Sequence, residues 1–386
     1  MARRRDRKVH SMNRFAALLL GALALQRVDG TAQTTADVYV PSRPETIAWG
    51  AFPIDKPAVA IVRSGQTVRI DTLSHAGSTQ EENPAVFLAK YGVKPDEILK
   101  DVMDFWAARS TLRQAGDGGG HVLTGPIYVE GAEPGDTLEV QILELKTRVP
   151  YGMNSTGPTG GVMRDEYPGA REGDRPLDIP EGTRHLIRTG TAGGKDVAFF
   201  SDRIHVPMNP FMGIMAVAPR NPVMGDVGVR APGLQGSGPP GDYGGNMDFR
   251  ALTVGTSLYL PVFHSGARFY TGDPHGVQGD GEVSGNALEQ SLTGVFRFVV
   301  HKGKTLTAPR AENAAHYIVM GIDVDLDRSM RMAVSEAVKF LVEEKGMTPA
   351  KAMSLCSIAV DFHVAEAVDG RQVVAGKIPK AVFLAN

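Results

Sequence analysis

Cysteine is almost absent from this sequence of 386 residues. Cys356 is the only one, so the chain cannot form an intramolecular disulfide. Its surroundings, MSLCSIAVDF, are apolar, and a lone cysteine in such a run is typical of a small core residue rather than of a nucleophile. Cysteine usage therefore favours neither a disulfide framework nor a thiol enzyme.

Common catalytic signatures are missing as well. The sequence has no G-x-S-x-G, no G-x-x-x-x-G-K-[ST], no H-E-x-x-H, and no G-x-G-x-x-G in front of a helical pattern. These absences argue against a serine hydrolase with a nucleophile elbow, a P-loop NTPase, a zincin and a dinucleotide-binding fold. No basic stripe with interleaved aromatic residues occurs beyond the N-terminus, so we expect no nucleic-acid partner.

Residues 1–32 are typical of a secretory signal peptide. A basic segment, Arg3 to Arg14, precedes the apolar run Phe15 to Leu25, and Gly30 and Ala32 supply small residues for cleavage. The apolar run is too short to span a bilayer, which takes about 20 residues. We therefore expect export to the periplasm or beyond, with cleavage near Ala32 and no membrane association of the mature form. A short buried N-terminal helix is the alternative.

Glycine and proline are frequent, with 45 and 25 residues, which favours strands and turns over a helical bundle. Apolar alternation predicts strands, and spacings of three and four residues predict two helices. One lies within residues 84–109 and starts at Pro95-Asp96, the other covers residues 329–345, and a further helix begins near Thr348. The strands are expected at residues 60–72, 121–145, 211–219, 257–263 and 295–301.

We therefore predict a mainly β fold for residues 33–386. It comprises a β-sandwich or jelly-roll-like core over residues 55–310 and an additional α+β C-terminal portion over residues 311–386. Residues 151–185 and 230–246 are rich in glycine and proline and have little periodicity, so we expect long loops there that contact substrate or cover a site.

The densest group of candidate functional residues lies in Gly272–Glu282, GDPHGVQGDGE. It contains Asp273, His275, Asp280 and Glu282, and several glycines allow the backbone to bend sharply. Asp273 and His275 share a face if the segment is extended, and an imidazole with a carboxylate suits Zn²⁺. The alternative is a polar surface loop that uses Asp and Gly for turns.

Further His and carboxylate groups flank predicted strands. His75 follows a strand that contains Asp71, and Asp248 follows a Gly-Gly-Asn turn. His121 and Glu130 flank the apolar stretch VLTGPIYV. Strand ends are the places where a β scaffold presents ligands, so these groups favour a functional edge over isolated surface residues.

In several long stretches the sequence resembles the acetamidase/formamidase family. The stretches follow the family order over about residues 60–385. They are TGPIYVEGAEPGDTLEVQIL (124–143), PFMGIMAVAP (210–219), GGNMD (244–248), SLYLPVFHSGARFYTGDPHGVQGDGEVSGNALE (257–289), AVDFHVAEAVDG (359–370) and KIPKAVF (377–383).

The resemblance implies hydrolysis of a short amide such as formamide or acetamide to a carboxylate and ammonia, on a β-rich fold that binds a metal. Zinc is the expected metal, with calcium as the alternative because carboxylates also suit a hard cation. Matching motif positions imply metal ligands at His75, Asp248, Asp273 and His275, and proton carriers at Glu282 and Glu130.

One residue departs from the family pattern. Many members have His immediately before GGN, where this sequence has Tyr243, and this leaves the substrate open. Two alternatives therefore stand beside the small linear amide: a larger amide or related C–N or ester substrate, and a β-sandwich protein that binds a metal or ligand without catalysis. Self-association into a homo-oligomer is a further expectation from the resemblance.

Overall fold

The computed structural model describes residues 35–113, 120–158, 160–165, 167, 169–171, 173, 180 and 182–384. The predicted signal peptide, residues 1–32, lies outside the described residues, and export stays a prediction. Within the described ranges, no helix is both long enough and apolar enough to cross a membrane.

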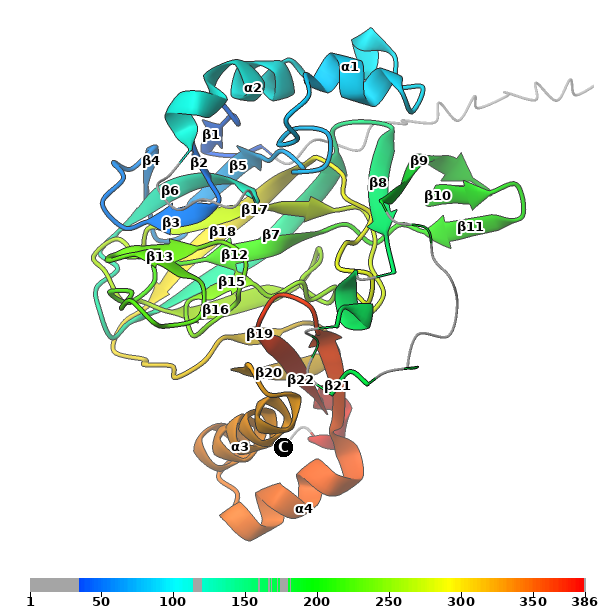
Figure 1. Ribbon diagram of the computed structural model, residues 1–386. Helices are drawn as coiled ribbons and strands as arrows, with labels where there is room; N and C mark the ends of the chain where they lie inside the picture. Colours follow the sequence, from blue (N-terminus) through cyan, green and yellow to red (C-terminus); the bar gives the residue numbers. More distant parts are fainter. Residues whose placement is uncertain are drawn as a thin grey trace, which may run out of the picture. The chain divides into compact units, whose positions relative to one another are not determined.

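The largest element is a nine-stranded sheet with the order β1-β5-β18-β7-β16-β19-β20-β22-β21 (Figure 1). Its strands are β1 (Val38–Val40), β5 (Thr67–Asp71), β7 (Thr137–Thr147), β16 (Ser257–Pro261), β18 (Leu292–His301), β19 (Arg310–Glu312), β20 (His316–Asp323), β21 (Asp361–Glu366) and β22 (Gln372–Pro379). Neighbouring strands are antiparallel except β1 and β5, which are parallel.

A six-stranded sheet carries most of the residues discussed below. Its order is β15-β12-β17-β6-β2, and β4 pairs in parallel with β6. The strands are β2 (Ile47–Trp49), β4 (Ala60–Arg63), β6 (Val122–Glu130), β12 (Phe211–Ala216), β15 (Gly244–Asn246) and β17 (Phe269–His275).

One apolar core joins the two large sheets. The ring of Phe269 in β17 lies 5.0 Å, centroid to centroid, from Phe298 and 6.3 Å from Phe296, both in β18. Buried residues of β6, such as Leu123, belong to the same cluster as those of β7, such as Val140. Two sheets with their apolar faces packed together confirm the prediction of a mainly β fold with a sandwich-type core.

The sandwich also explains a difference from simple hairpins. Residues 60–72 and 121–145 each form two strands, as predicted, but the members of each pair join different sheets. β4 and β6 enter the six-stranded sheet, whereas β5 and β7 enter the nine-stranded one. The intervening turns therefore cross from one layer of the sandwich to the other.

The two expected loops contain short strands. Residues 151–185 begin with β8 (Tyr151–Thr156), which pairs with β9 (Thr183–Ala192) in a four-stranded sheet with β10 (Lys195–Ser201) and β11 (Ile204–Pro207). Residues 230–246 overlap β13 (Val229–Ala231), β14 (Leu234–Gly236) and β15, and β14 pairs with β3 (Ala51–Pro53). Cross-strand pairing fixes β8, β9 and β14 although their own sequence lacks apolar alternation.

Helices cover two places. The helix predicted to start at Pro95 is the 3₁₀ turn η1 (Pro95–Glu97) followed by α2 (Lys100–Leu112). A separate helix, α1 (Pro84–Ala89), precedes it, and Gly92, with a φ of 76°, lies between the two. Phe105 of α2 packs edge-on against Trp49 of β2, at 5.3 Å between ring centroids. Further 3₁₀ turns are η2 (Gly161–Met163) and η3 (Lys380–Val382).

The C-terminal helices pack on the end of the nine-stranded sheet formed by β20 and β22 (Figure 1). α3 (Leu326–Lys345) ends at Gly346, as predicted, with φ 65°, and α4 (Pro349–Ala359) begins after Thr348, whose side chain accepts a hydrogen bond from the backbone of Lys351. Cys356 lies in this core, and the predicted α+β C-terminal portion is confirmed.

Leu341 of α3 is fully buried between the helices and the sheet. Replacing Leu341 by Ala should lower the free energy of unfolding by about 2–5 kcal/mol, because the change removes buried apolar surface and leaves a cavity. Urea denaturation measures the loss. Glu343→Ala, at an exposed position of the same helix, is the control and should change the value by less than about 0.5 kcal/mol.

Candidate functional site

Side chains from distant parts of the sequence meet at one edge of the six-stranded sheet. Because β6 and β17 are antiparallel, His121, just before β6, lies beside the C-terminal end of β17, which carries Asp273 and His275. β15 runs in the same direction as β17, so Asp248, two residues after it, reaches the same edge. Loops and a C-terminal turn supply the other members. Together they form the His–carboxylate cluster: His75, His121, Asp248, Asp273, His275, Glu282, Glu289 and Asp369.

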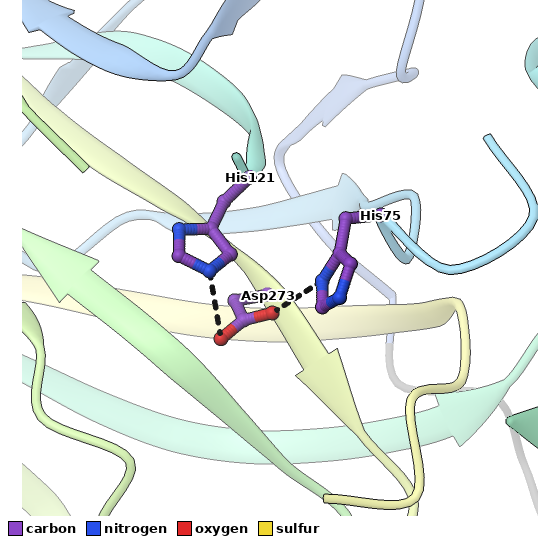
Figure 2. A group of neighbouring side chains, drawn as sticks. All are labelled: His75, His121 and Asp273. Carbon is purple, nitrogen blue, oxygen red and sulfur yellow. Dashed lines mark hydrogen bonds and ion pairs between the residues drawn. The ribbon is translucent and has the colours of Figure 1, made fainter. Parts of the chain in front are cut away.

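Asp273 is the centre of the cluster. One oxygen, Oδ1, lies 3.3 Å from His75 Nδ1, and the other, Oδ2, lies 3.7 Å from His121 Nε2 (Figure 2) and 3.2 Å from His275 Nε2. Burial by itself would raise the pKa of Asp273, but the His121 and His275 rings outweigh burial and hold that pKa well below its usual value.

Glu289 connects two of the imidazoles. Its Oε2 lies 3.4 Å from His75 Nδ1, and its Oε1 lies 3.4 Å from His275 Nε2. Burial disfavours the charged form of both rings. The carboxylates of Glu289 and Asp273 outweigh burial and raise the pKa of His75 and of His275 to about 9.

The remaining side of the cluster is wholly acidic. Asp248, Glu282 and Asp369 each offer a carboxylate oxygen, and these atoms lie within 4.8 Å of one another. Burial, followed by the repulsion of neighbouring carboxylates, raises the pKa of Asp248 and Glu282 well above the usual value. Asn246 orients the third acid, because its Nδ2 donates a hydrogen bond of 2.6 Å to Asp369 Oδ2.

Backbone strain coincides with the cluster. Asp248, Asp273 and Glu282 have φ values of 39°, 48° and 44°, in the left-handed region that side chains other than glycine rarely adopt. Gly213 of β12 completes the cradle, because a Cβ there would lie 2.8 Å from Asp273 Oδ2 and closer still to Asp248 Oδ1. Strain of this kind costs about 1–3 kcal/mol per residue and persists where the surrounding structure fixes a functional geometry.

The side chains of the cluster fit a bound cation. His275 is fully buried, yet neither of its ring nitrogens makes a well-formed hydrogen bond to a described residue, and the same holds for Asp248 Oδ1 and Glu289 Oε2. Buried charged groups are normally paired or coordinate a metal. The histidine-rich side suits Zn²⁺, and the side formed by Asp248, Glu282 and Asp369 suits a harder cation such as Ca²⁺.

The structure brings together five of the six residues that the sequence singled out: His75, Asp248, Asp273, His275 and Glu282. It does not bring Glu130 to them. Glu130 is the last residue of β6, nine residues beyond His121, which amounts to about 30 Å of extended strand. Its side chain is 55% exposed and lies 4.0 Å from Arg63 Nε. Glu130 flanks the same strand as His121, but at the opposite end.

Three members of the cluster were missed. His121 flanks a predicted strand, but only the pairing of β6 with β17 brings it to the site. Glu289 is the last residue of the resemblance stretch 257–289, and Asp369 lies in the stretch 359–370, so motif matching was the available signal for both. Asp369 lies in the turn between β21 and β22, and only the fold brings that turn to the cluster.

Tyr243 stands apart from the cluster. It is buried in the main core, its ring packs edge-on against Phe52 at 5.6 Å, and its hydroxyl donates a hydrogen bond of 2.7 Å to the carbonyl oxygen of Pro239. At this position the chain therefore uses an aromatic core residue, and the cluster draws its imidazoles from His75, His121 and His275.

Comparison with known proteins agrees with this architecture. The formamidase of Methylophilus methylotrophus is 26% identical over 368 residues, covering 82% of this chain and 84% of that protein. The acetamidase of Mycolicibacterium smegmatis is 33% identical over 201 residues, covering 42% and 49%. A crystal structure of acetamidase from Yersinia enterocolitica has the same fold, with a TM-score of 0.71 at 23% identity over 92% of this chain and 96% of that one.

The model of the acetamidase/formamidase family matches residues 111–237 and 229–385, which is well over half of the chain. These matched ranges include every residue of the cluster except His75. On this match, together with the shared fold, the chain belongs to the acetamidase/formamidase family.

Proposed function

We propose that this chain hydrolyses a short linear amide to a carboxylate and ammonia at the His–carboxylate cluster, with a divalent cation bound there. Membership of the family, and the relatives named formamidase and acetamidase, support a hydrolase of non-peptide C–N bonds. The single observation that supports a bound cation is the state of His275. This imidazole is fully buried among carboxylates, and neither ring nitrogen makes a well-formed hydrogen bond to a described residue.

We assign the cation ligands from the groups with converging atoms. His75, His121 and Asp273 form one group, and Asp248, Glu282 and Asp369 form another, with His275 next to both Asp248 and Asp273. Zinc fits the first group, and calcium is the alternative for the second. When bound, such a cation lowers the pKa of water and polarises a carbonyl group.

Glu289 is placed to move the proton. Burial raises its pKa, so at neutral pH its carboxylate accepts a proton more readily than an exposed Glu does. As the water oxygen bonds to the amide carbon, Glu289 Oε2 takes a water proton and then returns it to the nitrogen while the C–N bond breaks. The products are the carboxylic acid and ammonia. Glu282, predicted as a proton carrier, lies among the acids and is assigned here to the cation.

Replacing His275 by Gln should lower kcat for acetamide at least about 100-fold, because it removes a buried imidazole that contacts Asp273, Glu289 and Asp248. Ammonia release measures the rate, and circular dichroism checks that the fold is retained. His205→Gln, at an exposed position of β11, is the matched control. A well-folded His275→Gln protein that keeps the wild-type rate would refute the site.

Removal of the cation should abolish ammonia release from formamide and acetamide, and added Zn²⁺ should restore it, because the cluster supplies ligands rather than a nucleophile. Elemental analysis before and after chelation gives the metal content. Undiminished turnover in metal-free protein would contradict the proposal. Stoichiometric metal without turnover on a broad panel of amides would favour the alternative of a binding protein.

The metal-free protein should lose stability as the pH rises from 5 to 9. Acids with raised pKa values, such as Asp248 and Glu282, stabilise the fold below about pH 4, and this contribution is lost as the pH rises through their folded pKa. Protonated His75 and His275 also stabilise the fold. This stabilisation is fully present below about pH 6.5 and is lost as the pH rises through their folded-state pKa of about 9. Both effects act in the same direction.

Chemical denaturation at pH 5 and pH 9 should show a drop of more than about 1 kcal/mol, the equivalent of a one-unit difference in one pKa. The double variant Glu282→Gln with Asp369→Asn removes two of the repelling carboxylates and should flatten the dependence. If both proteins have the same profile, the acidic side of the cluster does not control stability.

A further inference from the structure

A cavity of about 250 Å³ adjoins the His–carboxylate cluster, and His75 and Glu289 form part of its wall. At this side the cluster meets solvent, because the side chain of His75 is 26% exposed while those of Asp248, Asp273 and His275 are at most 4% exposed. A substrate that enters this cavity therefore reaches Glu289, the proposed proton carrier.

The cavity is larger than the smallest amides require. Its volume equals that of about eight water molecules in the liquid, at roughly 30 Å³ each. Pockets for drug-sized ligands begin at about 300 Å³. The space therefore suits a molecule that is larger than formamide or acetamide by several atoms but smaller than a drug-sized ligand.

A single arginine lines this cavity. Arg184 of β9 lies directly opposite Ser155 of β8, and its guanidinium carbon is 5.6 Å from the ring centroid of Phe87. No carboxylate in the described part of the chain forms an ion pair with Arg184. Arg188, on the same strand, is by contrast paired with Glu97 at 2.6 Å.

The other lining groups are neutral. Ser155, Asn286 and Gln80 offer hydrogen bonds, and Phe87 and Met153 offer apolar surface. The cavity thus has His75 and Glu289 in one wall, uncharged groups in the others, and the exposed guanidinium of Arg184, which forms no ion pair with the residues that the structure describes. An arginine of this kind matches a carboxylate, to which it donates charge-assisted hydrogen bonds.

We infer that the preferred substrate is a short amide that carries a carboxylate at the end away from the amide group, and that Arg184 binds this carboxylate. The inference rests on the proposed function for the reaction itself. Hydrolysis of such a substrate converts its amide to a second carboxylate and releases ammonia, so the product is a dicarboxylate.

The test compares the monoamide of succinic acid with butanamide, which has a similar chain without the charge, and with acetamide. In the metal-loaded wild type, kcat/KM should be about tenfold or more higher for the charged amide than for butanamide. In Arg184→Gln the ratio of the two values should fall about tenfold. Arg184→Lys, which keeps the charge but not the planar fork, should recover part of the ratio.

Arg203→Gln is the matched control. Arg203 is an exposed cation in the turn between β10 and β11 of the same four-stranded sheet, outside the lining of the cavity, so the ratio should stay at the wild-type value. The same four proteins are titrated with the charged amide by calorimetry, since binding to Arg184 does not depend on turnover.

The outcomes separate the two claims. In one outcome the wild type hydrolyses acetamide but does not prefer the charged amide over butanamide, and Arg184→Gln binds the charged amide as tightly as the wild type does. The inference about Arg184 is then overturned and the proposed function stands. If no amide is hydrolysed, yet the charged amide binds the wild type and binds Arg184→Gln about tenfold more weakly, the anion site stands and the proposed reaction fails. Equal binding by both proteins overturns the inference in either case.

Discussion

Electrostatic repulsion between buried carboxylates is the constraint on which this structure depends. Five carboxylates and three imidazoles share a space in which the nearest oppositely charged atoms are 3.2–3.7 Å apart, and most of these side chains are almost fully buried. The imidazoles balance Asp273 and Glu289, but Asp248, Glu282 and Asp369 face mainly one another. The cation that we propose would relieve that repulsion and allow a folded protein to keep so many acids together.

The sandwich provides the rigidity that such a site needs. Asp273 and His275 lie in β17, a central strand of the six-stranded sheet whose Phe269 is packed against β18 of the opposite sheet. Three of the acids have a strained backbone, and Gly213 leaves the space that the carboxylates of Asp248 and Asp273 occupy. The scaffold therefore fixes the side chains of the cluster in advance, and a site of this kind needs little reorganisation during a reaction.

On the inference above, substrate selection involves a different part of the molecule from the proposed reaction. The small sheet of β8–β11 contributes Met153, Ser155 and Arg184 to the cavity beside the cluster, whereas the sandwich contributes the reactive groups. With the roles that we propose, the groups for C–N cleavage and those for recognition of the rest of the amide come from different sheets. The long segment after residue 150, which has little apolar periodicity, is thus where substrate preference can vary without disturbing the core.

The sequence by itself determined the elements with strong local signals: the strands with apolar alternation, α3 with its terminal Gly346, and the cap of α4 at Thr348. Periodicity and capping residues encode these elements because they depend on one segment alone. Five residues of the cluster came from motifs that resemble the family, not from periodicity. Tertiary structure alone decided which sheet each strand joined, and therefore that His121 and Asp369 reach the cluster and Glu130 does not. Strand pairing links residues far apart in the chain, and no local pattern encodes the choice of partner or the end of the strand that faces the site.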